Sequence, residues 1–292
     1  MQSINALSLA PDASIWLANS RHPHILHIFD HACNLTNERR EVLSIVTPQI
    51  GSGPFNLVIE NEICFSEHIN LQSLISNSLN HLNLGELIIN TANAKLWSPR
   101  PNWEMLYTRR DDILNQLMSL PTTNYQVYGL DIPFAESAQG YSATTNFQSL
   151  VSNLSSALVN ADIPSALTLT SQLAGLGAGL TPAGDDFILG AVLAAWIIHP
   201  PEIASVLAEE ITNTAAPLTT SLSAAWLKSG GKGEAGIFWH SFFNALISAN
   251  PVQIQEAMDD LLAVGATSGA DALAGFTGTF VCWAELVSSK IP

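Results

Sequence analysis

The spacing of apolar residues changes near residue 102 and divides the chain into two parts of different character. Before this point the apolar residues come in brief runs that Pro, Gly or Asn separates, and such runs predict short strands. The runs are residues 14–18, 24–29, 42–46 and 55–60. Residues 71–82 instead have apolar side chains at helical spacing and predict a helix. We therefore expect the first part to be mixed and β-rich.

After Trp103 the apolar residues recur every three or four positions, which predicts helices to the end of the chain. A polar connection at 122–145, with a candidate strand at 126–130, interrupts them. The predicted fold is α+β, with a mixed β-rich domain at 1–102 and a mainly helical domain at 103–292. The expected helices cover residues 103–118, 147–159, 163–176, 186–198, 201–212, 218–228, 235–248, 252–264 and 271–287.

The balance of charge excludes two classes of partner. Lys and Arg total 10 against 25 Asp and Glu, which gives a formal net charge of −15 at pH 7. A surface of this kind repels the phosphates of nucleic acids and of anionic membranes, so we expect neither as a partner. The longest strongly apolar run, residues 187–198, is shorter than the ~20 residues that cross a bilayer.

The N-terminal residues and the cysteines favour a cytoplasmic location. Residues 1–14 lack the basic segment and the long apolar run of a secretory signal. Cys33, Cys64 and Cys282 are an odd number of cysteines without metal-ligand spacing, which fits reduced thiols.

A near-repeat in the helical part is the strongest functional signal. Gly184, Asp186 and Gly190 have the same spacing as Gly269, Asp271 and Gly275, and each set follows a Thr and opens an apolar helix. A helix start presents unpaired backbone N–H groups and the positive end of the helix dipole, which together bind anions. The two helix starts are therefore expected to face one pocket.

The aspartates restrict what such a pocket can bind. An Asp about 4 Å from a phosphate charge costs ~4 kcal/mol at an effective dielectric constant of 20. Either Asp185 and Asp186 hold Mg²⁺ that bridges to the anion, or the aspartates bind amide or ammonium-like donors while the anion lies beside the glycines. In a third interpretation the aspartates only cap helices and the glycines only permit turns and close packing. The spacing does not choose among the three.

A second cluster, formed by His22, His24, His27 and His31, is compatible with a metal-dependent hydrolase. Alternation along a strand cannot bring all four side chains to one point, so surface and half-buried histidines are the favoured interpretation. The chain has no nucleophile elbow, Walker loop or common zinc motif, and catalytic residues therefore stay unassigned.

Residues 175–190 and 264–276 resemble the AllH-like family of bacterial proteins, which includes the AllH subunit of oxamate carbamoyltransferase. The resemblance extends to Thr219, Thr220 and Ser221 and to parts of the N-terminal half. Ala178 and Ala183 depart from the family pattern, which has Pro and Ser there, so any role of that Ser hydroxyl is lost or passes to Thr181. The matching positions are Gly177, Gly179, Leu180, Thr181, Pro182, Gly184, Asp185, Asp186 and Phe187, then Gly265, Thr267, Ser268, Gly269, Asp271, Leu273 and Gly275.

The resemblance implies a carbamoyltransferase subunit that interconverts oxalurate and phosphate with oxamate and carbamoyl phosphate during anaerobic allantoin use. It implies a small anionic substrate, other carbamoyltransferase subunits as partners, and arginines from those subunits where phosphate needs them. Two alternatives are a non-catalytic assembly subunit and the histidine-dependent hydrolase. The expected ligand-binding residues are Gly177, Gly179, Thr181, Gly184, Asp185, Asp186, Thr220, Ser221, Thr267, Ser268, Gly269 and Asp271, with Asp185 and Asp186 as the metal ligands if Mg²⁺ binds.

Overall fold

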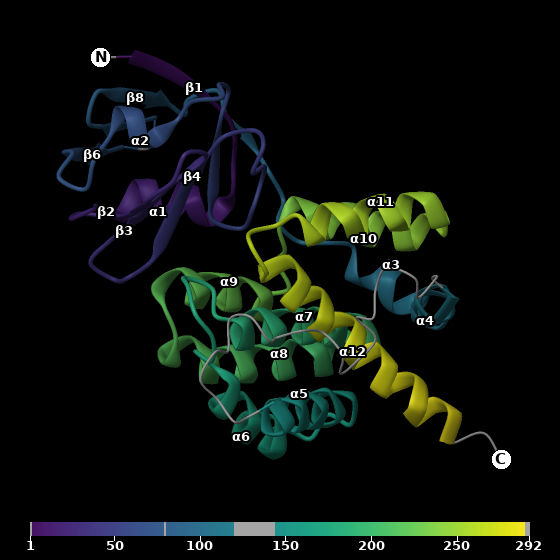
Figure 1. Cartoon of the computed structure of the whole chain (residues 1–292). Coiled ribbons are helices and arrows are strands. Elements are labelled where there is room, and N and C mark those ends of the chain that lie inside the picture. Colours follow the sequence, from purple (N-terminus) through teal and green to yellow (C-terminus); the bar gives the residue numbers. More distant parts are fainter. Residues whose placement is uncertain (1, 79, 120–143, 290–292) are drawn as a thin grey trace. The chain divides into compact units, whose positions relative to one another are not determined.

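The computed structural model describes residues 2–78, 80–119 and 144–289, the side chains of 144–146 excepted. The chain forms two compact units, shown in Figure 1. Unit 1 is Met1–Pro99 with Ala235–Ile237, and unit 2 is Arg100–Glu234 with Phe238–Pro292. Strands predominate in unit 1 and helices in unit 2, so the predicted α+β class is confirmed. The strand expected at 126–130 lies outside the described residues.

Unit 1 is built on a sheet whose described strands follow the order β2-β3-β4-β5-β1-β8-β7-β6, with β9 paired to β1. The central strand β1 runs antiparallel to β5 and parallel to β8. The strands are β1 (Gln2–Leu9), β2 (His24–Ile28), β3 (Ala32–Thr36), β4 (Val42–Val46), β5 (Asn56–Ile59), β6 (Ile75–Asn77), β7 (His81–Leu84), β8 (Leu87–Asn90) and β9 (Lys95–Leu96).

The predictions for 24–29, 42–46 and 55–60 are confirmed as β2, β4 and β5, whereas the strand expected at 14–18 is wrong. That segment belongs to the helix α1 (Pro11–Asn19), in which Pro occupies the first helical position, where its missing N–H costs nothing. Ala13, Trp16 and Leu17 are the buried residues of α1, and their spacing is that of one helix face. The apolar residues at 14–18 therefore belong to a helix that packs through one face, not to a strand.

The helix expected at 71–82 is also wrong, because this segment supplies β6 and the start of β7. Leu82 and Leu84 of β7 are fully buried and alternate with Asn83, as in a strand with one face in the core. The register pairs Leu82 with Ile89 of β8. This pairing with a strand outside residues 71–82 outweighs the helical spacing of the apolar residues within them. A one-turn helix, α2 (Phe65–His68), precedes these strands.

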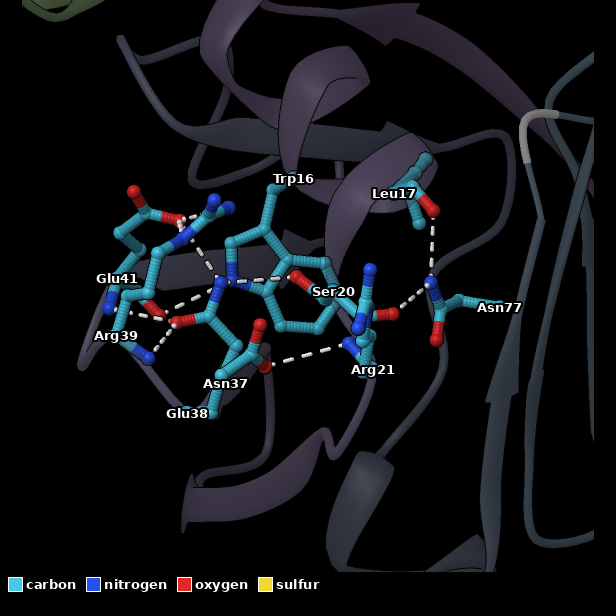
Figure 2. A network of polar contacts seen from close by, with 9 residues as sticks. All are labelled: Trp16, Leu17, Ser20, Arg21, Asn37, Glu38, Arg39, Glu41 and Asn77. Carbon is cyan, nitrogen blue, oxygen red and sulfur yellow. Dashed lines mark hydrogen bonds and ion pairs between the residues drawn. The ribbon is translucent and has the colours of Figure 1, made fainter.

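The turn between β3 and β4 is tied to the end of α1 by the buried side chain of Asn37 (Figure 2). Its Nδ2 donates to Ser20 Oγ at 2.9 Å, and its Oδ1 accepts from the backbone N–H groups of Arg39 and Glu41. Trp16 Nε1 donates to the Glu41 carbonyl at 3.0 Å, so the indole also fastens the turn. These bonds satisfy the polar groups that the packing of α1 on the sheet removes from water.

Unit 2 contains the helices that the apolar spacing predicted, with ends that differ by a few residues. The helix expected at 103–118 is divided into two at Arg109, and the helix expected at 218–228 lies three residues later, at Ser221–Gly231. Helix α7 begins three residues earlier than expected and is buried along its whole length. The helices are α3 (Trp103–Thr108), α4 (Arg110–Ser119), α5 (Thr144–Val159), α6 (Ile163–Leu173), α7 (Ala183–Ile198), α8 (Pro201–Ala215), α9 (Ser221–Gly231), α10 (Ile237–Ser248), α11 (Pro251–Leu262) and α12 (Ser268–Ser289), with a 3₁₀ turn at Ala216–Leu218. None of the described helices is both long and apolar enough to span a membrane.

Helices α7 and α12 pack directly against each other, and α12 crosses the middle of the helical unit in Figure 1. The glycines of the near-repeat permit this contact. A Cβ on Gly190 would lie 1.7 Å from the Ala272 carbonyl oxygen, and one on Gly275 would lie 2.0 Å from that of Phe187. Each helix therefore contributes one glycine to the place where the two backbones approach most closely.

Candidate ligand site at the paired helix starts

The first turns of α7 and α12 lie side by side. Thr181, two residues before α7, and Ser268, the first residue of α12, share a hydrogen bond of 2.7 Å between their hydroxyls. Both residues are half-buried. Because the helices also touch at Gly190 and Gly275, further along in the same direction, their N-terminal halves run together. The structure thus brings together the two helix starts that the near-repeat singled out.

Two more glycines of the near-repeat have packing roles. A Cβ on Gly184 would lie 2.1 Å from the Leu173 carbonyl oxygen, and one on Gly269 would lie 1.7 Å from that of Leu261. The Gly184 N–H donates to Leu176 O at 2.8 Å, and the Gly269 N–H donates to Val264 O at 3.0 Å. These amides are already satisfied inside the protein, so neither is available to an external anion.

The loop before α7 has a different character. Gly177 and Gly179 are exposed and have φ values of 122° and 92°, which an L side chain rarely adopts. Among the described residues, none accepts a hydrogen bond from the backbone N–H groups of 177–181. A glycine-containing loop with unpaired amides beside a helix start is an arrangement that binds anions.

Asp185 is held by donors from the protein itself. Its Oδ1 accepts from the Gly175 N–H at 2.8 Å, and its Oδ2 accepts from the hydroxyls of Thr219 and Ser223, the latter at 2.8 Å. Burial raises the pKa of this carboxyl, and the hydrogen bonds from Thr219, Gly175 and Ser223 act in the opposite direction. Both oxygens are thus occupied, and the side chain fastens the glycine loop to α7 and α9.

Asp186, the next residue, is only 6% exposed and has a different environment. Its Oδ2 is buried and has no hydrogen-bond partner among the described residues. Burial raises the pKa of this carboxyl to about 8, and the charges of Asp271 and Asp185 act in the same direction, while hydroxyl contacts with Ser268 and Thr181 lower it. At pH 7 the Asp186 carboxyl therefore carries a proton for most of the time.

Asp271 is the counterpart of Asp186 on α12. It is 4% exposed, and its Oδ2 likewise has no hydrogen-bond partner within the described parts of the chain. Burial raises the pKa of Asp271 to about 6, and a hydrogen bond from the Thr267 side chain lowers it. At pH 7 the Asp186–Asp271 pair therefore carries roughly one negative charge.

The remaining expected residues lie at the start of α9 and directly before α12. Thr220 caps the start of α9, where its side chain accepts from the Ser223 N–H and donates to the Leu180 carbonyl, and Ser221 follows it at the first position of the helix. Thr267 is exposed. Thr219 was part of the family resemblance but not of the expected ligand-binding set, which also lacked Ser223 and the Gly175 amide. The signal for the first two was the Thr- and Ser-rich stretch 219–223, which places several hydroxyls at one helix start.

Metal binding by Asp185 is disfavoured, because both of its oxygens already accept hydrogen bonds. No group of three or more His, Cys, Asp or Glu side chains in the described residues could hold a metal ion. A Mg²⁺ ion at this site would take its protein ligands from Asp186 and Asp271 and keep several waters. The histidine cluster does not converge either. His24 and His27 lie on β2, and His31 is 3.8 Å from Glu62 through its Nδ1.

The helical unit thus holds a candidate site for a small ligand at two paired helix starts. Residues 173–280 match the family described as oxamate carbamoyltransferase subunit AllH, so the chain is AllH-like over this segment. The segment runs from the last residue of α6 into α12 and contains every residue expected to bind the ligand. The resemblance deduced from the sequence is confirmed there. No solved structure was found that matches the chain.

Proposed function

We propose that this protein is a subunit of a cytoplasmic oxamate carbamoyltransferase that serves allantoin nitrogen use, and that the paired starts of α7 and α12 bind its small anionic substrate. The observation that carries the proposal is the pair Asp186 and Asp271. Both are buried carboxyls with an unpartnered oxygen at adjacent helix starts, inside the AllH-like segment. A buried acceptor without a partner costs about 1–3 kcal/mol, so a site of this kind is retained where a ligand uses it.

The reaction needs positioned groups rather than a covalent enzyme intermediate. A phosphate oxygen attacks the carbamoyl carbon of oxalurate, the new C–O bond yields carbamoyl phosphate, and the C–N bond breaks. Oxamate leaves with the electron pair on its nitrogen and takes up the proton that phosphate gives up. Such a displacement is accelerated by holding the two reactants in line and by hydrogen-bond donors aimed at the developing oxyanion.

The loop 177–181 supplies donors of that kind. Its backbone N–H groups have no acceptor among the described residues, and it leads into the positive end of the α7 dipole. The repulsion expected between phosphate and aspartate is reduced, because Asp186 is protonated at neutral pH and Asp185 is surrounded by donors. Asp271 keeps its charge near pH 7, and Mg²⁺ between Asp271 and the anion would cancel that repulsion.

The scarcity of basic residues supports a shared active site. The chain has 10 Lys and Arg, and the charges that act on the Asp186 carboxyl are those of Asp271 and Asp185. Phosphate sites commonly use the two-pronged hydrogen bonds of arginine. We therefore infer that partner subunits complete the site, and that the chain alone binds substrate more readily than it turns substrate over.

Ligand binding tests the site, and reconstitution tests the activity. Thermal unfolding of the purified protein is measured with phosphate, carbamoyl phosphate and oxamate, each with and without Mg²⁺, and then with the partner subunits added. We expect a ligand-dependent rise in Tm that Asp186→Ala abolishes. Glu202→Ala, in the exposed first turn of α8, is the matched control and should respond as the wild type does.

The activity assay follows the formation of carbamoyl phosphate from oxalurate and phosphate by the assembled subunits. Stabilisation that appears only with partner subunits, together with full activity of Asp186→Ala in the assembled enzyme, would favour a non-catalytic assembly role. Absence of any ligand effect, alone or assembled, would exclude the proposed site.

A further inference from the structure

Asp186 and Asp271 each have a carboxyl oxygen without a hydrogen-bond partner among the described residues, whereas neighbouring Asp185 has none. All three carboxyls are at least 94% buried, yet only Asp185 has both oxygens engaged by donors from the described chain. The two unpartnered oxygens are Oδ2 of Asp186 and Oδ2 of Asp271. The two carboxyls lie in the first turns of α7 and α12, which pack against each other, and the charge of Asp271 acts on the Asp186 carboxyl.

We propose that Asp186 and Asp271 bind the –NH₂ end of a primary amide, so that this site selects a carbamoyl or carboxamide ligand over the corresponding carboxylate. The inference rests on the proposed function and deepens it by assigning the part of the substrate that these side chains hold. A primary amide carries two N–H donors on one planar nitrogen, and the pair offers two buried oxygens without a partner. Asp271 Oδ2 accepts as a carboxylate oxygen, and Asp186 Oδ2 accepts when the proton of that carboxyl is on Oδ1.

The charges at the site favour a neutral donor over a cation. Two helix starts each contribute about half a positive charge, and both lie at this pair. An ammonium or metal ion would gain from the aspartates but be repelled by the helix ends, whereas a neutral –NH₂ avoids that repulsion. A second carboxylate would be repelled by the single charge that the pair carries at neutral pH.

The two half-buried hydroxyls set the position of the pair. Thr181 and Ser268 bond to each other at 2.7 Å and both contact the Asp186 carboxyl, so they hold α7 to α12, and Asp186 Oδ2 stays buried without a partner from the described chain. The exposed loop around Gly179 leads directly into Thr181, so its unpaired amides are the donors nearest in the chain for the anionic end of the ligand. Oxamate and carbamoyl phosphate each have one –NH₂ end and one anionic end, which matches this division.

The test compares oxamate with oxalate, which has nearly the same size and differs by replacing –NH₂ with a second carboxylate oxygen. Binding of each to the full-length protein is measured by calorimetry at pH 7 without added metal. We expect the wild type to bind oxamate at least ten times more tightly than oxalate. In Asp271→Asn the ratio should fall about tenfold, because an Asn side chain offers a donor to the second carboxylate and removes the negative charge.

Asp186→Asn is the second variant, and Glu202→Gln on α8 is the matched control, which should keep the wild-type ratio. Equal binding of oxamate and oxalate by the wild type would overturn the inference, as would failure of oxamate to bind. Binding of NH₄⁺ or Mg²⁺ alone that Asp271→Asn abolishes would also overturn it, because the pair would then be a cation site. The wild-type ratio decides the question even if a variant does not fold.

Failure here and failure of the proposed function give different results. Calorimetry needs no turnover, so a preference for oxamate without carbamoyltransferase activity in the assembled enzyme would leave this inference intact and remove the proposed function. If the assembled enzyme keeps its carbamoyltransferase activity in both Asp186→Asn and Asp271→Asn, and the wild type shows no preference for oxamate over oxalate, this inference is removed and the proposed function stays.

Discussion

Neighbouring aspartates at the start of α7 have different environments because successive helix residues point about 100° apart. Asp185 points to the donors of the glycine loop and α9, while Asp186 points to α12. The first carboxyl therefore stabilises the fold, and the second keeps a buried oxygen without a partner among the described residues. This difference lies in the tertiary contacts, since the two residues are identical in type and adjacent in the sequence.

The raised pKa of Asp186 makes the folded protein less stable as pH rises. The unfolded chain loses this proton near pH 4 and the folded chain near pH 8, so between these values the folded state binds more protons and the free energy of unfolding decreases with pH. Asp186→Asn removes the effect. We expect its loss of stability between pH 5 and pH 8 to be smaller than that of the wild type by roughly 1–4 kcal/mol.

Urea unfolding at pH 5 and pH 8 measures this difference, with Glu202→Gln as a control that should keep the wild-type slope. Identical slopes for Asp186→Asn and the wild type would show that the folded and unfolded states release this proton at the same pH.

We expect the Asp185 side chain to stabilise the folded protein and the Asp186 side chain to contribute little to the free energy of unfolding. Asp185→Ala leaves the Gly175 N–H and the hydroxyls of Thr219 and Ser223 without their acceptor. We expect a loss of about 2–4 kcal/mol in the free energy of unfolding at pH 8, against little loss or a gain for Asp186→Ala. Chemical unfolding of the two variants side by side makes the comparison, and equal losses would contradict the assignment of separate roles.

At the scale of elements, the α7–α12 crossing depends on glycine. Gly275→Ala would put a Cβ 2.0 Å from the Phe187 carbonyl oxygen, and the backbones would have to separate. Alanine gains roughly 1 kcal/mol of helix propensity over glycine, but overpacking at a close contact costs more. We expect a net loss of about 1–3 kcal/mol and a lower Tm.

Gly278→Ala is the matched control in the same helix. A Cβ at Gly278 would meet its nearest neighbour, Ser155 Oγ, at 3.9 Å, which is an ordinary contact. This variant should therefore be stabilised by up to about 1 kcal/mol through helix propensity alone. Thermal unfolding of both variants decides the matter, and a stabilised Gly275→Ala protein would show that the crossing does not require glycine.

The elements also show where local patterns suffice. Helices of unit 2 such as α7 and α12 were predictable because each is long enough for its apolar period to repeat over several turns. Short segments carry no such repetition. The five residues at 14–18 and the twelve residues at 71–82 were both predicted wrongly, because the packing of α1 on the sheet and the pairing of β7 with β8 decide their structure.

At the scale of the whole molecule, every residue expected at the site belongs to unit 2. The domain division near residue 102 is a prediction that a fragment can test. We expect a fragment of residues 100–292 to keep its helices and its rise in Tm with oxamate, because Arg100, 5.1 Å from the centre of the Trp196 ring, and Trp103 pack within unit 2.

The fragment should have a lower Tm than the full chain, since Ala235 and Ile237 lose their hydrogen bonds to Pro99 and Ser52. Far-ultraviolet circular dichroism and thermal unfolding with oxamate are the measurements, and the fragment with Asp186→Asn is the control. A fragment without helical signal would contradict the division, and a folded fragment that ignores oxamate would show that residues 1–99 contribute to binding.

Periodicity and motif spacing are local properties of the chain, and they were enough to predict the α+β class, the helices of the C-terminal part and the positions of the two Gly/Asp helix starts. They left open whether the glycines serve packing or binding and which aspartate has an oxygen without a partner. Tertiary structure decided both, since backbone approach at Gly190 and Gly275 and the donors around Asp185 come from residues distant in sequence. Only three-dimensional packing settles which buried acceptors find a donor within the protein.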